Sequence, residues 1–323
     1  MKKLLTLFLV FIAFSCQKPQ TNIKVAGTVF GTSYQAVYSS DVNYEKQFDS
    51  IFHVINKSMS TYIPNSDISK INRNETVMVD EHFKTVLAGS KEVYRYTEGL
   101  FDPTIGAVVN AWDFGPEGKI ENLDSLKINE LMKTVGLNRV GLVNGSIQKP
   151  LPVRLDFNAI AKGYGVDVIG EFLESKGIEN YLVEIGGEIR LKGINVEKEA
   201  IWKVGVQNPS LDENTPFLKS IELTDKAMAT SGTYRKFKID ENGNRYAHII
   251  DAKTGYPSKT NVLSVSVIAD NCMMADAYAT ALQAMSIEEI KSFLEKHHDL
   301  QVFLIFENAN KELETLALNH FPE

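Results

Sequence analysis

The chain has only two cysteines among its 323 residues, Cys16 and Cys272, and neither the cysteines nor the six histidines have the spacing of a zinc site. It has no dense basic stretch. Its formal net charge is −7, and removal of Lys2 and Lys3 would take this to −9. These features argue against nucleic-acid binding. The absence of sequence repeats and persistent heptads excludes repeat architectures and long coiled coils.

A single apolar run, residues 4–14, follows Lys2 and Lys3 and is too short to span a bilayer stably. It has the form of a secretory signal. The residues up to Cys16 read Ala-Phe-Ser-Cys and resemble a bacterial lipobox; plain secretion with cleavage nearby is the alternative. We therefore expect a signal at 1–15, a tether at 16–22 with Cys16 lipidated, and one domain at 23–323. A lipidated Cys16 leaves no intramolecular disulfide, so stability must come from the core.

The hydrophobic pattern alternates irregularly between helical and strand-like segments. This predicts an α+β protein with mixed or antiparallel sheets and flanking helices. The expected helices are residues 44–59, 83–94, 104–111 and 273–285, with another that begins at a capping box on Ser286 and Glu289. The expected strands are 182–185, 188–191, 202–206, 234–239, 245–250, 263–268, 302–306 and 313–316, with a hairpin at 140–147 around Asn144-Gly145.

Residues 154–193 carry the most informative local pattern. We expect an apolar strand that ends in Asp156, a small-residue loop through Ala159 and Lys162, and then an amphipathic helix. Such a loop presents free backbone N–H groups and the positive end of the helix dipole to an anion, with phosphate the obvious candidate. The alternative is an ordinary strand–helix connection in which Asp156 is a capping residue.

Three further groups could carry chemistry. Asp276 and Thr280 lie at i and i+4, so one helix face offers two hard oxygen ligands suited to Mg²⁺. Alternatively, Asp276 is solvated or caps a helix, and the Thr280 hydroxyl bonds its own helix backbone. His248 and Asp251 flank a turn, where His248 either moves a proton or is structural. Tyr62 follows a helix and either stacks on a flat ring or covers the edge of the core.

Several short segments form a collinear pattern over most of the chain. They are Gly31-Thr32-Ser33-Tyr34, MSTYIPNSDISKIN from Met59, GLFDPTIGAVVNAWDFG from Gly99, LDFNAIAKGYGVD from Leu155, YLVEIGGEIRLKG from Tyr181, ATSGTYRKF from Ala229, HIIDAKTGYP from His248 and DAYATAL from Asp276. This pattern resembles the ApbE family of FAD:protein FMN transferases. The resemblance implies a T-fold-related architecture with an FAD cleft between a smaller N-terminal part and a larger part.

The resemblance also implies roles for individual residues. Phe30 stands where relatives often have Met against the cofactor, and Lys162 stands where relatives can carry an acidic residue. The residues expected at the cofactor are Phe30, Tyr62, Leu100, Phe101, Asp102, Asp156, Lys162, Ile249 and Ile250. The expected Mg²⁺ ligands are the backbone carbonyl of Ala159 with Asp276 and Thr280, and His248 is the expected base, with Asp251 second.

The implied reaction moves the FMN part of FAD onto a threonine hydroxyl of an acceptor protein and releases AMP. The implied acceptors are exported flavoprotein subunits of sodium-pumping NADH:quinone oxidoreductase or Rnf-type complexes. A lipid anchor would hold the enzyme on a bacterial membrane, facing the periplasm or the cell exterior. Two alternatives remain: an FAD pyrophosphatase, in which water replaces threonine, and a flavin-binding lipoprotein without catalysis.

Overall fold

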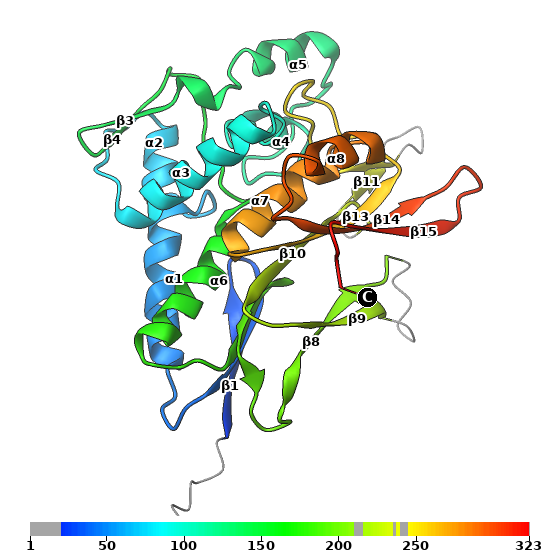
Figure 1. The fold of residues 1–323 in the computed structure, drawn as a ribbon. Coiled ribbons are helices and arrows are strands. Elements are labelled where there is room, and N and C mark those ends of the chain that lie inside the picture. Colours follow the sequence, from blue (N-terminus) through cyan, green and yellow to red (C-terminus); the bar gives the residue numbers. More distant parts are fainter. Residues whose placement is uncertain (1–20, 210–215, 235–236, 240–244, 323) are drawn as a thin grey trace, which may run out of the picture.

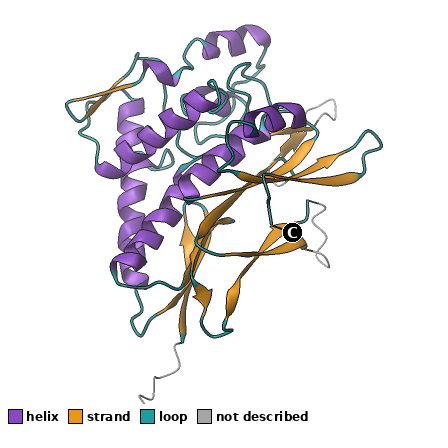
Figure 2. Cartoon of the chain, in the orientation of Figure 1, coloured by secondary structure: helices purple, strands orange, loops and turns teal. Residues whose placement is uncertain are grey.

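The computed structural model describes residues 21–209, 216–234, 237–239 and 245–322. In this part of the chain, helices gather on one face of a large sheet and a smaller sheet covers part of the other face (Figure 1, Figure 2). The arrangement is the α+β class expected from the sequence, with antiparallel sheets and flanking helices. Cys16 and the expected signal lie outside the described residues. No described helix has the length and apolar character needed to cross a bilayer.

The large sheet has eight strands in the described part of the chain, in the order β1-β2-β5-β6-β10-β13-β14-β15, and every neighbouring pair is antiparallel. Its strands are β1 (Asn22–Val29), β2 (Thr32–Ser39), β5 (Tyr181–Ile185), β6 (Glu188–Lys192), β10 (Lys226–Gly232), β13 (Val262–Ala269), β14 (Gln301–Glu307) and β15 (Leu313–Leu318). The smaller sheets contain β7 (Ile194–Asn195), β8 (Ala200–Gln207) and β9 (Phe217–Leu223); β3 (Gly141–Val143) and β4 (Ser146–Gln148); and β11 (Phe237–Ile239) and β12 (Arg245–Ala247).

The described helices lie in two stretches of the chain, one between β2 and β5 and one between β13 and β14. They are α1 (Glu45–Met59), α2 (Asp67–Asn72), α3 (Glu81–Tyr96), α4 (Gly106–Ala111), α5 (Ser125–Met132), α6 (Ala161–Ser175), α7 (Cys272–Gln283) and α8 (Ile287–Leu294), with a short 3-10 turn η1 (Leu137–Arg139). The expected capping box on Ser286 and Glu289 is present at the start of α8.

The central strands are apolar on both faces because both faces are covered. In β14, Val302 and Leu304 belong to the core on the helix side, whereas Phe303 and Ile305 belong to the core against β8 and β9. This is the period of two expected of a strand, with each set of side chains buried on its own side.

Two expectations are wrong: one helix begins later than expected, and one strand is not formed. The expected helix at 104–111 begins only at Gly106, because Asp102 turns the preceding chain by accepting hydrogen bonds from the backbone and hydroxyl of Thr104. The expected strand that ends in Asp156 is not formed; Arg154 makes only an isolated bridge to Ile105. Pro150 and Pro152 lack backbone N–H donors, which disfavours a regular ladder there.

The strand expected at 234–239 includes residues 235–236, which lie outside the described residues, and β11 covers its last three residues. The strand expected at 245–250 is shorter in the structure, where it is β12. The expectations from sequence did not include the β1–β2 hairpin, α2, α5, β7, β9 or the central strand β10.

Helices α6 and α7 cap each other. The carboxylate of Asp167, on α6, accepts hydrogen bonds from the backbone N–H groups of Cys272 and Met273 at 2.9 and 2.8 Å. In return, Oδ2 of Asp276, on α7, accepts from the backbone N–H of Gly163 at 3.0 Å. Ile160 at the N-cap position of α6 provides no side-chain cap, so Asp276 serves that helix end from a distant part of the chain.

Gly163 is the residue that allows this close packing. A Cβ there would lie 2.3 Å from the carbonyl oxygen of Cys272 and 2.8 Å from Cβ of Asp276. We therefore expect Gly163→Ala to lower the free energy of unfolding by about 1–3 kcal/mol, measured by urea denaturation. Gly141→Ala is the control, because the nearest atom to its added Cβ is the Gln148 carbonyl oxygen at 3.9 Å. Equal stabilities for the two variants would contradict this account of the packing.

Candidate functional site

A pocket of about 300 Å³ opens beside α2, the start of α4 and the segment that ends in Asp156. Both Tyr62 and Asp156 line it, so the structure brings these two expected cofactor residues together. The remaining lining residues are Thr61, Pro64, Ser69, Asn72, Arg73, Gly106, Asn110, Pro116, Glu117, Arg154 and Leu155. Arg154 and Glu117 form an ion pair at its edge.

Asp156 is fixed by its own loop. Its backbone N–H donates to the Pro103 carbonyl at 2.7 Å, and its carboxylate accepts from the backbone and side-chain amides of Asn158 at 2.8 and 3.2 Å. A Cβ on Gly106 would lie 3.1 Å from Cβ of Asp156, so a glycine at the start of α4 keeps this approach open. The contacts place a negative charge at the pocket wall.

Tyr62 lies in the turn that follows α1, and 58% of its surface is exposed. Partial burial and the nearby charge of Asp156 raise the pKa of the Tyr62 phenol, which keeps it neutral at physiological pH. A neutral ring that projects at the rim of a pocket is suited to stacking against a flat group. The structure is thus compatible with a binding role for Tyr62, which stays a prediction.

Leu100, Phe101 and Asp102 are placed in the core and in its supporting turns. Phe101 is buried in the main core, and Leu100 packs against that core. Asp102 is also buried; besides Thr104, it accepts a hydrogen bond from the backbone of Leu137 at 3.2 Å. Burial raises the pKa of Asp102, and these hydrogen bonds oppose that rise. The contacts seen are structural, and a cofactor role for these residues stays a prediction.

Phe30 occupies the two-residue turn of the β1–β2 hairpin with a φ of 51°, followed by Gly31 at 76°. Positive φ is unfavourable for a bulky residue, by about 1–3 kcal/mol, unless its surroundings hold it there. The ring packs edge-on to Phe52, with the centroids 5.7 Å apart, and lies close over Gly165 of α6. Phe30 is therefore packed against the helix that carries Lys162.

A second group of expected residues meets where α6 begins. Asp276 is 3% exposed, and its Oδ1 lies 3.9 Å from Nζ of Lys162. Lys162 also pairs with Glu188 of β6 at 2.5 Å. Burial lowers the pKa of the Lys162 ammonium, but the carboxylates of Asp276 and Glu188 outweigh this and raise it overall, so Lys162 is a permanent cation.

Glu188 was not among the residues that the sequence indicated. It is 3% exposed, and its Oε2 is buried without a hydrogen-bond partner among the described residues. Burial raises the pKa of the Glu188 carboxyl, which the ammonium of Lys162 opposes. The only sequence signal for it was its position directly after the Gly186-Gly187 turn in the YLVEIGGEIRLKG segment.

The residues expected to bind metal fit a hard cation by their chemistry. They offer the carboxylate of Asp276, the hydroxyl of Thr280 and the carbonyl oxygen of Ala159, which accepts no hydrogen bond among the described residues. The Thr280 hydroxyl is paired with that of Ser231 at 3.2 Å. The described residues contain no group of three or more His, Cys, Asp or Glu side chains that could hold a metal, so a cation here would need oxygen ligands from the backbone, hydroxyls or substrate.

His248 and Asp251 lie in the segment that follows β12. The His248 ring packs edge-on to Phe114, with centroids 6.2 Å apart. Oδ1 of Asp251 accepts hydrogen bonds from the backbone of Lys253 and Thr254 at 2.7 and 3.3 Å, so this carboxylate shapes its own turn.

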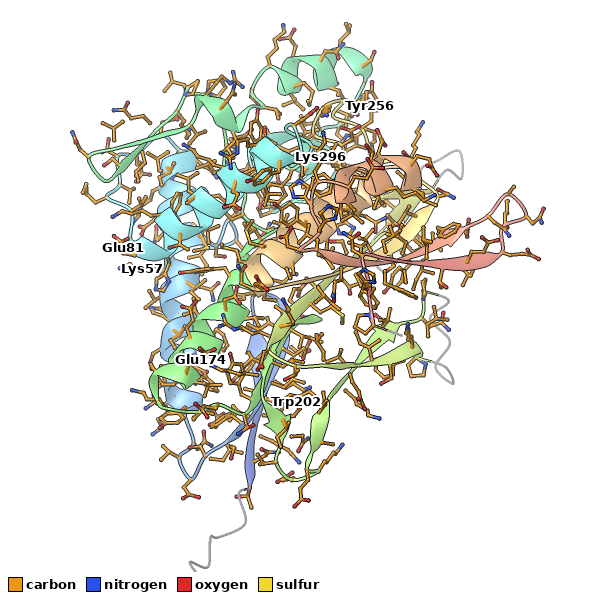
Figure 3. All side chains as sticks on the ribbon, in the orientation of Figure 1. Lys57, Glu81, Glu174, Trp202, Tyr256 and Lys296 are labelled. Carbon is orange, nitrogen blue, oxygen red and sulfur yellow. The ribbon has the colours of Figure 1, made fainter. Side chains whose placement is uncertain are left out.

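Ile249 and Ile250 are buried, and Ile250 forms an isolated bridge to Pro257. The indole N–H of Trp112, after α4, donates to the Gly255 carbonyl at 2.9 Å and ties this segment to α4. Tyr256, next along this turn, lies at the α5 end of the molecule (Figure 3). The segment that carries His248 is thus attached to the same helix, α4, that borders the pocket.

Comparison with known proteins places this geometry in context. A family model described as the ApbE family matches residues 30–304. The chain is 36% identical over 296 residues to the FAD:protein FMN transferase of Vibrio cholerae, covering 88% of each sequence. It is also 36% identical to the FAD:protein FMN transferase of Haemophilus influenzae, covering 96% of this chain and 95% of the relative.

Solved structures agree with the sequence relatives. The flavin transferase ApbE of Vibrio cholerae superposes with a TM-score of 0.83 at 33% identity, covering 93% of this chain and 97% of the other. The ApbE protein of Thermotoga maritima superposes with a TM-score of 0.79 at 28% identity, covering 91% and 96%. These matches confirm both the resemblance seen in the sequence and the expected fold.

The capping contact of Asp276 can be separated from its charge. Asp276→Ala removes the acceptor for the Gly163 N–H, and we expect it to lower the free energy of unfolding by about 1 kcal/mol, the usual cost of a lost N-cap. Asp276→Asn keeps an acceptor oxygen and should lose less. Urea denaturation of both variants checks this. Equal losses would show that the hydrogen bond to Gly163 does not stabilise α6.

Proposed function

The chain belongs to the ApbE family, and we propose that it is an FAD:protein FMN transferase that moves FMN from FAD to a threonine hydroxyl of an acceptor protein, with Mg²⁺ and release of AMP. The observation that carries the proposal is the placement of Asp276 and Lys162 at the N-terminus of α6, in a fold shared with flavin transferases. A helix N-terminus, a lysine and a carboxylate suited to a cation together form a site for a pyrophosphate.

The reaction is a displacement at phosphorus. The threonine oxygen forms a bond to the phosphorus of the FMN part while the bond from that phosphorus to the bridging oxygen breaks. AMP keeps the bridging oxygen and its electron pair, and the hydroxyl proton passes to a base. In such reactions the protein mainly positions groups and offsets charge.

Each residue has a distinct part in this proposal. Asp276, Thr280 and the Ala159 carbonyl would hold Mg²⁺, which, when bound, neutralises charge on the pyrophosphate oxygens. Lys162 offers a permanent positive charge beside them. Tyr62 and Asp156 line the pocket and would bind the nucleotide. His248 would accept the hydroxyl proton, which imidazole does well near neutral pH.

The proposal is tested by incubating the protein with FAD, Mg²⁺ and an acceptor candidate and measuring the mass of the acceptor. We expect a gain of one FMN that is lost on chelation of the metal. His248→Asn should bind FAD normally and lose transfer, because His248 meets the hydroxyl and not the ground-state nucleotide. Asp276→Asn should fold and also lose transfer. FMN and AMP formed without any mass gain would instead favour the pyrophosphatase.

Tyr62 provides a test of nucleotide binding without chemistry. We expect Tyr62→Ala to weaken FAD binding by about 1 kcal/mol, roughly fivefold in Kd, because an aromatic contact is lost. Fluorescence titration of FAD measures this. Tyr96→Ala is the matched control, since Tyr96 is also an exposed tyrosine but packs against His297 at the end of α3. A Kd unchanged by Tyr62→Ala would assign Tyr62 to the edge of the core.

We also propose that Cys16 is lipidated and anchors the protein to a bacterial membrane, with exported flavoprotein subunits as acceptors, such as those of sodium-pumping NADH:quinone oxidoreductase or Rnf-type complexes. The lipobox-like Ala-Phe-Ser-Cys sequence supports this. Cys16→Ser should release soluble protein on cell fractionation, because stable anchoring needs acyl chains. Cys272→Ser is the control; Cys272 is buried. A Cys16→Ser protein that stays with the membranes would place the anchor elsewhere.

A further inference from the structure

The charges around Lys162 are arranged unevenly. Its ammonium has two buried carboxylates within reach, yet it lies 2.5 Å from Oε1 of Glu188 and 3.9 Å from Oδ1 of Asp276. The first is a close ion pair, and the second is beyond hydrogen-bonding distance. Lys162 therefore pairs with Glu188 and stands away from Asp276.

This arrangement leaves Asp276 only partly engaged. Its Oδ2 accepts the backbone N–H of Gly163, so one oxygen holds the end of α6. Among the described residues, its Oδ1 meets only the more distant ammonium of Lys162. If Lys162 closed on Asp276, the ammonium would compete with any cation for the same oxygen, because both need the carboxylate charge.

Among the described residues, the Glu188 carboxylate is held by its ion pair with Lys162. Burying a carboxylate is costly even when it is paired, and Oε2 of Glu188 has no hydrogen-bond partner among the described residues. The Lys162 side chain, by contrast, is 31% exposed and could reach other positions. Something must hold its ammonium where it is, and Glu188 is the close contact that does so.

We propose that Glu188 is a positioning residue that keeps Lys162 away from Asp276, so that Oδ1 of Asp276 stays available to a divalent cation. The inference rests on the proposed function, since it assumes that Asp276 is a ligand. Glu188 itself need not touch the cation or the substrate. Its effect reaches them through Lys162, in the way that outer residues of metal sites orient the ligands.

The test is Glu188→Gln, with two readouts that do not depend on turnover. A crystal structure of the metal-free variant should show Nζ of Lys162 within hydrogen-bonding distance of Oδ1 of Asp276. Mn²⁺ binding followed by electron paramagnetic resonance should weaken by about ten- to a hundredfold, the range usual for loss of a supporting residue. The double variant Glu188→Gln with Lys162→Met removes the competitor and should restore Mn²⁺ binding to within about threefold of the unmodified protein.

Glu174→Gln is the matched control. It removes the same charge from an ion pair with Arg190. Glu174 lies near the other end of α6 (Figure 3). It is twelve residues after Lys162, which corresponds to about 18 Å along the helix. Its Mn²⁺ affinity should not change. If Glu188→Gln does not fold, Glu188→Asp replaces it. The shorter Asp side chain should hold the Lys162 ammonium less tightly than Glu188 does and weaken Mn²⁺ binding by a smaller factor.

Two results would overturn the inference. One is a Glu188→Gln structure in which Lys162 remains near 3.9 Å from Asp276, because weaker Mn²⁺ binding would then reflect the lost charge alone. The other is a double variant that binds Mn²⁺ no better than Glu188→Gln. Failure of the proposed function is distinguishable, because it would appear as absent FMN transfer by the unmodified protein while the position of Lys162 still responds to Glu188.

Discussion

The reciprocal capping of α6 and α7 is the interaction on which the rest of the structure depends. Asp167 and Asp276 each satisfy backbone N–H groups at the start of the other helix. These helices lie against the centre of the large sheet, where α7 packs on β10 and β13 and α6 on β5 and β6 (Figure 1). Because each carboxylate is fixed by a helix from a distant part of the chain, the two helix ends cannot separate without leaving buried N–H groups unpaired.

The same interaction builds the candidate site. One oxygen of Asp276 stabilises α6, and the other faces Lys162. A single side chain therefore has both a structural and a chemical role. The two interpretations of Asp276 left open by the sequence, a capping residue and a metal ligand, are therefore compatible. Small side chains contribute as well: buried alanines of α7 pack beside β10, and this brings the hydroxyls of Thr280 and Ser231 to 3.2 Å.

Much of the fold could be predicted from local sequence signals, because several helices are amphipathic and several begin at a side-chain cap. The capping box of α8 is one such signal. Central β10 escaped prediction because its Lys-Ala-Met-Ala-Thr-Ser-Gly sequence lacks the β-branched alternation of a typical strand. Its small residues allow close packing under α7, a contact that exists only once the sheet and helices are assembled. The strand expected before Asp156 had apolar residues, but its prolines lack the N–H donors that ladder hydrogen bonds need.

The candidate site likewise contains some residues that the sequence could predict and others that it could not. Asp276 and Thr280 are four residues apart on one helix, so their common face follows from helix geometry alone. Glu188 is 88 residues before Asp276 in the chain, and the two carboxylates meet Lys162 only because β6 lies beside β10, under the two helices. No spacing rule connects such residues. A buried carboxylate held by one lysine is visible only once the fold is known, and the charge balance around Lys162 is accordingly the part of the site that sequence reasoning could not supply.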